Sequence, residues 1–471
     1  MTFRTRLLVF LTLPLPGLAV AYASPPPDLG ALQAELDQLV AASTLDAENQ
    51  PYRNAVVLLD VPQHSFTYRG ASGIGSVQPR AAMTADHQFY IESITKTFTA
   101  TVVLQLAEEG LLGDNGLDTT LGELQLFPPE VLDQLHRIED NSYGASITVG
   151  QLLHHRTGMK NFTYEDEGGT VGDYPGLDFA PNSLLGLFIA DPEKGLIGVL
   201  ETARKHLPEG TDPTKSIGDN GFPSDLDLEP FYFFSPPFEH WDYNAWKSDP
   251  QDRFSGLLNF YLSAMNQTAK FPPGEEFAYT DTNYLVLGLL VEKVTGNSLH
   301  SELRKRIFDP LGMDRSYMSY ATDPAADKYR KKLSELWAIN LPIVGLKLNR
   351  SMMWSDAGIV STVDDLNTFL RALASGNLFK NEATLKTMLA LPEGVEMGYG
   401  CGIGINRRGD DTILFHSGGA ASWMFYYVNA DITFIGTMND AGGEGRQRFG
   451  GVQQGFLQAL GKQGISISSP F

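Results

Sequence analysis

Ser93 and Lys96 stand three residues apart at the start of a predicted helix, and this spacing can make a serine nucleophilic. Residues i and i+3 lie on the same helix face, so the lysine ammonium can approach the serine hydroxyl. The free N–H groups and the positive dipole end of a helix N-terminus also favour an oxyanion there. For the tetrapeptide alone, a helix-capping serine with a solvated lysine is the alternative.

A tyrosine in a loop is the second candidate group. Pro273 and Gly274 form a turn that delivers Tyr279 to a loop just before an apolar helical run from Tyr284 onward. A phenol beside a lysine ammonium can be held partly as phenolate, so Tyr279 is a candidate general base. A buried structural tyrosine that bonds a backbone carbonyl is the alternative.

The third candidate group separates two strand-like segments, 411–415 and 422–428. It contains His416, Ser417, Gly418 and Gly419. Glycines on a strand let another backbone approach closely, as a substrate that docks edge-on requires. The Gly419 N–H could then complete an oxyanion hole with that of Ser93. A tight turn that needs glycine only for its backbone angles is the alternative.

The order of these motifs, S-x-x-K, then Y-x-D, then H-x-G, resembles the serine beta-lactamase and penicillin-binding-protein superfamily. The likeness is strongest to the branch of class C beta-lactamases, D-alanyl-D-alanine carboxypeptidases, D-aminopeptidases and family VIII carboxylesterases. It covers most of the chain except about residues 160–270. Further segments that resemble family landmarks are 89–112, 147–159, 282–296, 309–313 and 358–373.

The resemblance implies roles for the candidate residues. Ser93 would be the acylated nucleophile and Lys96 its proton-handling partner. Tyr279 would act as base toward Ser93 and as acid toward the leaving group, and the Ser93 and Gly419 N–H groups would form the oxyanion hole. The residues implied to bind substrate are Asp281, His416, Ser417 and Gly418.

Two positions depart from the family pattern. Asp281 stands where the tyrosine motif usually has Asn, and its charge would pair with Lys96 and disfavour a substrate carbonyl oxygen there. His416 in place of Lys removes a fixed cation that could hold a substrate carboxylate. Both changes favour ester or amide hydrolysis over efficient beta-lactamase action.

The elements that must position these residues are readable from periodicity. Helices are expected up to about residue 42, over 93–110 along one apolar stripe, and near 451–460, with strands at 54–60 and 65–70. The resemblance implies an α+β fold of the beta-lactamase type. Its antiparallel sheet, flanked by helices, would come from 28–114 and 346–471, and a mainly helical region from 115–345, with the active site in the cleft between them.

An insertion between family landmarks, at about 160–270, is rich in acidic and aromatic residues. Its aromatic density argues against disorder, so we expect either a lid that shapes the substrate site or a self-packed decoration. A lid of this composition would favour neutral or cationic acyl groups.

The N-terminus reads as a secretory signal peptide at residues 1–23, with Arg4 and Arg6 before an apolar run too short to span a membrane. The sequence therefore predicts a periplasmic or extracellular protein without a membrane span after signal removal. A net charge of −21 argues against nucleic acid as a partner. Cys401 is the only cysteine, so no internal disulfide exists, and a buried strand position is expected for it.

No metal site or cofactor is predicted, because the chain lacks H-E-x-x-H, a cysteine ligand set and a phosphate-binding glycine loop. The sequence indicates an exported serine hydrolase that forms an acyl-enzyme with a small-molecule or peptide substrate. The substrate would be a D-amino-acid peptide or amide, as for a D-Ala-D-Ala carboxypeptidase, or a small ester. A catalytically weak penicillin-binding or sensor protein is the alternative. The oligomeric state is not predicted.

Overall fold

The computed structural model describes residues 26–161, 269–319, 329–344 and 354–467, apart from short gaps at 47, 51–52, 78–79, 330, 339–340, 343, 393–395, 409–410, 442 and 466. The expected signal peptide and nearly all of the insertion lie outside the described residues. Both stay predictions, as do the domain boundaries.

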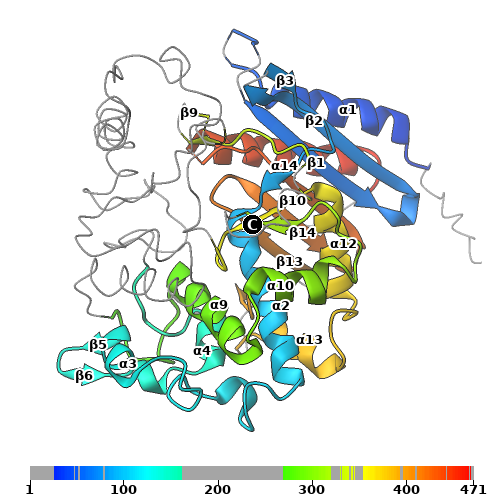
Figure 1. Ribbon diagram of the computed structural model, residues 1–471. Coiled ribbons are helices and arrows are strands. Elements are labelled where there is room, and N and C mark those ends of the chain that lie inside the picture. The colour runs from blue at the N-terminus through cyan, green and yellow to red at the C-terminus, as the bar shows by residue number, and fades with distance from the viewer. Residues whose placement is uncertain are drawn as a thin grey trace, which may run out of the picture.

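An eight-stranded sheet joins the two ends of the described chain, and its neighbouring strands are antiparallel throughout (Figure 1). The strand order is β11-β12-β13-β14-β15-β1-β2-β3. The bounds are β1 Asn54–Val61, β2 Phe66–Val77, β3 Arg80–Ala82, β11 Met397–Tyr399, β12 Gly404–Arg408, β13 Asp411–Ser417, β14 Ser422–Tyr427 and β15 Ile432–Thr437. Because β1 pairs with β15, segments from opposite ends of the sequence lie side by side.

Strand β1 is apolar from Ala55 to Leu59, and these residues are buried on both faces of the sheet. Val56 and Leu58 belong to the hydrophobic cluster on one face of the sheet. Ala55, Val57 and Leu59 belong to the cluster on the other face. Side chains alternate across a strand, so a two-sided core requires a continuous apolar run.

Helices α1 (Leu29–Ala42) and α14 (Gly443–Lys462) pack together over one face of the sheet (Figure 1). Helix α14 begins eight residues before the expected start at 451. Gly450 and Gly451 read as a helix break in the sequence. Burial of residues such as Phe456 against the sheet outweighs that local preference.

The opposite face is covered by α12 (Val363–Ala374), which contacts β1, β14 and β15. Beside it lie helix α2 (Thr95–Glu108) and a small sheet of order β4-β10-β7, with β4 at Phe89–Tyr90, β10 at Ile359–Ser361 and β7 at Tyr317–Met318. The other described helices are α3 Pro129–Leu135, α4 Val149–Leu153, α9 Asp281–Thr295, α10 Leu299–Leu303 and α13 Glu382–Met388. The short elements are η1 Pro62–His64, η2 Glu92–Ile94, η3 Gly116–Asp118, η4 Gly144–Ser146, the π-helical η5 Arg304–Phe308, β5 Arg137–Ile138, β6 Asn141–Ser142, β8 Trp337–Ala338 and β9 Leu341–Pro342. The predicted α+β class is confirmed.

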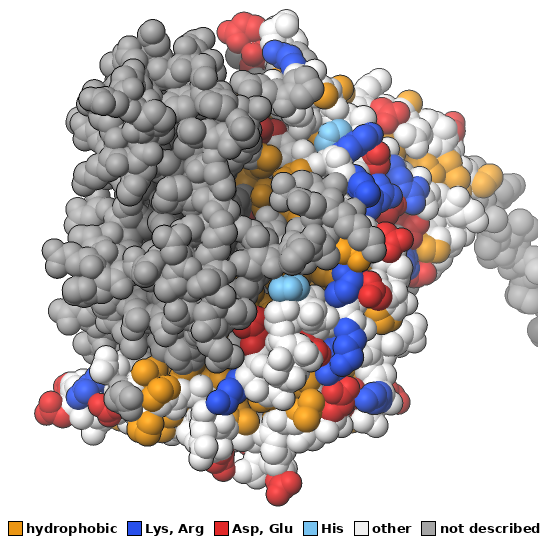
Figure 2. Space-filling view, in the orientation of Figure 1, with side chains coloured by type: hydrophobic (Ala, Val, Ile, Leu, Met, Phe, Trp, Pro, Cys, Tyr) orange, Lys and Arg blue, Asp and Glu red, His pale blue; other side chains and the backbone are white. Residues whose placement is uncertain are grey.

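Basic and acidic side chains lie interspersed on the described part of the face shown in Figure 2. The net negative charge of the chain is therefore not gathered into a single-sign patch there. Within the described ranges, no helix combines the length and apolarity that a membrane crossing requires.

Candidate active site

Ser93 lies in the 3-10 turn η2, immediately before α2, as predicted for a residue near a helix N-terminus. Its side chain is half-buried, and the preceding residue, Glu92, has a φ of 51°. A left-handed backbone is strained for a residue with a β-carbon, so tertiary contacts must hold the turn. Ser422 provides one of them, because its Oγ donates to the Ile91 carbonyl at 2.9 Å.

Helix α2 is buried on nearly all sides, so burial extends beyond the predicted apolar stripe to its threonines. Its threonine hydroxyls find acceptors in the surrounding protein: Thr97 donates to the Gly402 carbonyl at 2.6 Å and Thr99 to that of Ser355 at 2.7 Å. A β-carbon on Gly402 would lie 2.8 Å from the Lys96 carbonyl oxygen. Glycine at 402 therefore lets the chain approach α2 closely.

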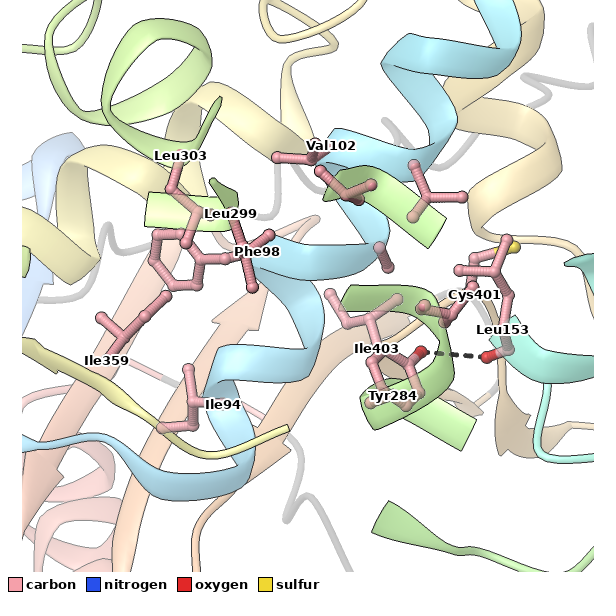
Figure 3. Close-up of a cluster of buried hydrophobic side chains, with 14 of the residues drawn as sticks. Ile94, Phe98, Val102, Leu153, Tyr284, Leu299, Leu303, Ile359, Cys401 and Ile403 are labelled. Atoms are coloured by element: carbon pink, nitrogen blue, oxygen red, sulfur yellow. Dashed lines mark hydrogen bonds between the residues drawn. The ribbon is translucent and has the colours of Figure 1, made fainter. Parts of the chain in front are cut away.

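The apolar contacts of α2 fix the helix that carries the lysine. Figure 3 shows Phe98 beside Leu299 and Leu303 of α10, within the buried cluster. In the same view the Tyr284 hydroxyl of α9 donates to the Leu153 carbonyl at 3.0 Å. Packing from α9, α10 and α13 thus restricts where α2 can lie.

Lys96 is fully buried and its ammonium contacts the serine. The Lys96 Nζ donates to Ser93 Oγ at 3.1 Å and to the Asp356 carbonyl oxygen at 3.1 Å. The same atom lies 2.6 Å from Asp281 Oδ1. The expected ion pair between Asp281 and Lys96 is therefore present, and Asn161 Nδ2 donates to the other carboxylate oxygen at 3.4 Å.

The surrounding charges keep Lys96 protonated. Burial alone would lower the pKa of its ammonium, but the carboxylates of Asp281 and Asp356 outweigh burial and the pKa is raised. Burial raises the pKa of the Asp356 carboxyl to about 7, against the opposing effect of Lys96. Asp281 occupies the first turn of α9, where the helix dipole favours a carboxylate. Lys96 therefore donates to Ser93 as a cation.

Tyr279 lies over the lysine. Its ring centroid is 5.0 Å from Lys96 Nζ, within cation–π range. The ring of His155 lies 4.3 Å from it, centroid to centroid, and that of Tyr399 lies 5.9 Å away at 89°. Ser93, Lys96 and Tyr279, which are separated by up to 186 positions in the sequence, thus meet in one place.

The turn after α4 holds the loop that carries Tyr279. The Gly274 N–H donates to the Arg156 carbonyl at 2.7 Å, and the Lys270 N–H donates to that of Gly158 at 2.8 Å. This turn is the segment that resembles the H-x-S-G landmark of the family. In the structure this turn holds the tyrosine loop in place through backbone hydrogen bonds.

His416 is buried on β13, and both of its ring nitrogens bond within the protein. Nδ1 lies 2.9 Å from the Ser417 carbonyl, which can only accept, so Nδ1 carries the proton and Nε2 accepts from the Tyr399 hydroxyl at 2.8 Å. Burial, with a further contribution from Lys96, lowers the pKa of His416 to about 3. Burial also raises the pKa of the Tyr399 hydroxyl well above its usual value. The pair is therefore uncharged at neutral pH.

The turn between β13 and β14 lies against the nucleophile turn. A β-carbon on Gly418 would lie 2.6 Å from the Ile91 carbonyl oxygen, so glycine allows this approach. Ser417 and Gly419 are exposed. Within the described part of the chain, neither the Ser93 N–H nor the Gly419 N–H donates to a protein acceptor. Both groups are thus available for an oxyanion.

Cys401 is buried, as expected, but it lies in the bend between β11 and β12, so the expected strand position was wrong. Burial raises the pKa of its thiol to about 12, which disfavours a reactive thiolate. Among the described residues, no cluster of three or more His, Cys, Asp or Glu side chains is suited to a metal ion.

Sequence reasoning missed three residues of the site: Tyr399, Asp356 and His155. His155 lay within a segment that resembles a family landmark, but no contact with the tyrosine loop was predicted for it. Tyr399 lies in the glycine-rich stretch 398–404, in which only Cys401 was given a predicted place. Asp356 comes two residues before a recognised family segment. Both residues lie close to segments that were recognised in the sequence. That closeness does not reveal which side chains point into the site.

The beta-lactamase family profile matches residues 38–184 and 239–454 of the chain. The D-aminopeptidase of Brucella anthropi is 26% identical over 210 residues, which cover 43% of this chain and 39% of that protein. The chain thus spans about two fifths of the length of the curated relatives it matches.

Solved structures of the same fold include a D-stereospecific amidohydrolase from Streptomyces sp., with a TM-score of 0.55 and 21% identity over 88% of this chain and 97% of that one. A D-amino acid amidase from Ochrobactrum anthropi SV3 gives a TM-score of 0.57 and 18% identity over 92% and 99%. These likenesses show that the fold is shared.

Proposed function

The chain belongs to the beta-lactamase family, and from that premise we propose that it is a serine hydrolase that acts through an acyl-enzyme on amides of D-amino acids or on small esters. The observation that carries the proposal is the contact of Ser93 Oγ with the buried ammonium of Lys96, at 3.1 Å. The names of the relatives and structural neighbours support the D-amino-acid part of the proposal.

The proposed chemistry begins at Ser93. Lys96, as a cation, stabilises the developing alkoxide and cannot take its proton. Tyr279, starting as the phenolate, therefore accepts that proton as Ser93 Oγ bonds to the acyl carbon. The N–H groups of Ser93 and Gly419 bind the oxyanion. When the intermediate collapses, the C–N or C–O bond breaks and Tyr279 returns the proton to the leaving group. Water then attacks the acyl carbon of the acyl-enzyme and gives a proton to Tyr279. Tyr279 returns that proton to Ser93 Oγ as the acid product leaves.

The charge state of the site favours a leaving group without a free carboxylate. Lys96 is engaged with Ser93, Asp281 and the Asp356 carbonyl, and His416 is neutral. Neither side chain offers a cation to a C-terminal carboxylate. Simple amides and esters should therefore be turned over better than peptides that end in D-alanine.

The test is a hydrolysis panel on the full chain, with D-alanine amide, L-alanine amide, D-Ala-D-Ala, p-nitrophenyl acetate and nitrocefin. We expect turnover of the D-amide and the ester, weak turnover of the dipeptide, and none by the matched variant Ser93→Ala. Turnover of D-Ala-D-Ala at the rate of the amide would overturn the proposed leaving-group preference. A stable adduct with no turnover would indicate a penicillin-binding sensor.

We also propose that the protein is exported. This rests on the charged and apolar pattern of residues 1–23. Fractionation of cells that express the full chain, followed by N-terminal sequencing of the exported species, would test it.

A further inference from the structure

We propose that His155 is a positioning residue that fixes Tyr279 over Lys96; the proposal rests on the proposed role of Tyr279 as the proton-transfer group. The loop before Tyr279 has no helix or strand to hold it, since α9 begins only at Asp281. A tyrosine that takes a proton from Ser93 must nevertheless stay in a fixed place.

His155 bonds the backbone on both sides of the tyrosine. Its carbonyl accepts from the Ala278 N–H at 2.9 Å, and its Nδ1 accepts from the Thr280 N–H at 3.2 Å. The imidazole also faces the phenol ring, with 4.3 Å between centroids and 36° between planes. One residue therefore restrains the peptide before Tyr279, the peptide after it and the ring itself.

The chemistry of the ring suits this role. Nδ1 can accept from Thr280 only while the imidazole is neutral, with its proton on Nε2. His155 is fully buried, and burial, with repulsion from Lys96, lowers its pKa well below the usual value. Within the described residues, Nε2 has no hydrogen-bond partner. The imidazole thus accepts a hydrogen bond at Nδ1 and packs its ring face against the ring of Tyr279.

The backbone of His155 is itself in an uncommon state, with a φ of 53°. Such a conformation persists in a residue with a β-carbon only where neighbours enforce it. Asparagine tolerates this conformation and its amide oxygen can accept near the position of Nδ1. His155→Asn therefore keeps the acceptor, whereas His155→Phe keeps the ring and loses the acceptor.

The experiment compares amide and activated-ester turnover in the full chain. Both substrates need Tyr279 to take the Ser93 proton. D-Alanine amide also needs a proton from Tyr279 on its leaving group, whereas p-nitrophenolate leaves without one, so the amide is the more sensitive substrate. We expect His155→Phe to lower kcat for the amide at least tenfold more than kcat for p-nitrophenyl acetate, with KM for the amide changed less than threefold. His155→Asn should restore most of the amide-to-ester ratio.

The matched control is His154→Phe, since the neighbouring His154 is also buried in part but bonds the Gly150 carbonyl, at 2.8 Å. It should change stability without changing the amide-to-ester ratio. An unchanged amide-to-ester ratio in His155→Phe, whether both activities fall together or neither falls, would overturn the positioning role. Failure of the wild type to become acylated at Ser93 would instead refute the proposed function itself.

Discussion

The two ends of helix α2 carry ionic clusters of different design. At the N-terminal end, fully buried Lys96 contacts Asp281 at 2.6 Å and the Ser93 hydroxyl at 3.1 Å. At the C-terminal end, about 20 Å away, the Arg306 guanidinium lies 2.9 Å from Glu109 and 2.5 Å from Glu302. The first cluster contacts Ser93, the proposed nucleophile, and the second is proposed to be structural.

The difference shows what separates a reactive site from a structural one in the same helix. The C-terminal cluster matches two cations with two acids, because Lys380 Nζ also lies 3.2 Å from Glu109, and it links the end of α2 to α10 and η5. The Lys96 cluster places one cation among two acids, one of which has a pKa raised to about 7. It lies beside the strained turn at Glu92 and beside N–H groups that donate to no acceptor among the described residues. Backbone strain and unequal charge distinguish the end that we propose to be reactive.

The largest expected effect is on activity at the N-terminal end. Lys96→Met keeps the apolar length and removes the cation, so turnover of the D-amide should fall by roughly 10³-fold. The free energy of unfolding should change little, because the buried ammonium is removed and the Asp281 carboxylate keeps the dipole of α9 and the Asn161 amide as partners. Steady-state kinetics and urea unfolding measure both quantities, and retention of a tenth of the activity would argue against a catalytic lysine.

The matching change at the C-terminal end should affect stability alone. Arg306→Met leaves Glu302, which is 1% exposed, without its principal counter-charge. The free energy of unfolding should fall by about 3 kcal/mol. Turnover per folded molecule should stay at the wild-type value, measured well below the melting temperature. A large loss of turnover in Arg306→Met would contradict the claim that the C-terminal cluster is only structural.

A third change tunes the reactive cluster without removing the lysine. In Asp281→Asn the ammonium loses a carboxylate that raises its pKa, so that pKa falls. Because Lys96 must stay charged, the basic limb of the pH profile of kcat/KM should move to lower pH. Glu276→Gln, an exposed change in the tyrosine loop, is the control and should not move it. An unmoved limb in Asp281→Asn would contradict the assignment.

The smallest expected effect is on the pH dependence of stability. The pKa of Asp356 is raised in the folded state to about 7, so its contribution to stability is present below the unfolded value of about 4 and is lost as the pH rises through 7. Relative to Asp356→Asn, the wild type should therefore lose roughly 2–3 kcal/mol between pH 5 and pH 8. Urea unfolding at both pH values checks this, and parallel curves for the two proteins would count against the raised pKa.

The fold was predictable where sequence patterns are local or resemble a known family. The terminal hairpin, the first helix and the α+β class follow from apolar periodicity and motif order. The start of α14 and the all-round burial of α2 did not, because tertiary packing decides both. A threonine-rich face reads as exposed until its acceptors, such as the Gly402 carbonyl, are known.

The candidate site divides in the same way. Ser93, Lys96, Tyr279 and the charge of Asp281 could be chosen from spacing and resemblance. The partners of His416, the raised pKa of Asp356 and the hold of His155 on the tyrosine loop depend on distances between segments far apart in the sequence. No pattern in the local sequence indicates those distances.

The most direct test of the central assignment is intact-protein mass spectrometry of the full chain after incubation with a fluorophosphonate. The account predicts one adduct per chain, located on Ser93 by peptide mapping, and no adduct in Ser93→Ala. An adduct on another residue, or labelling that persists in Ser93→Ala, would contradict the claim that the N-terminal end of α2 carries the nucleophile.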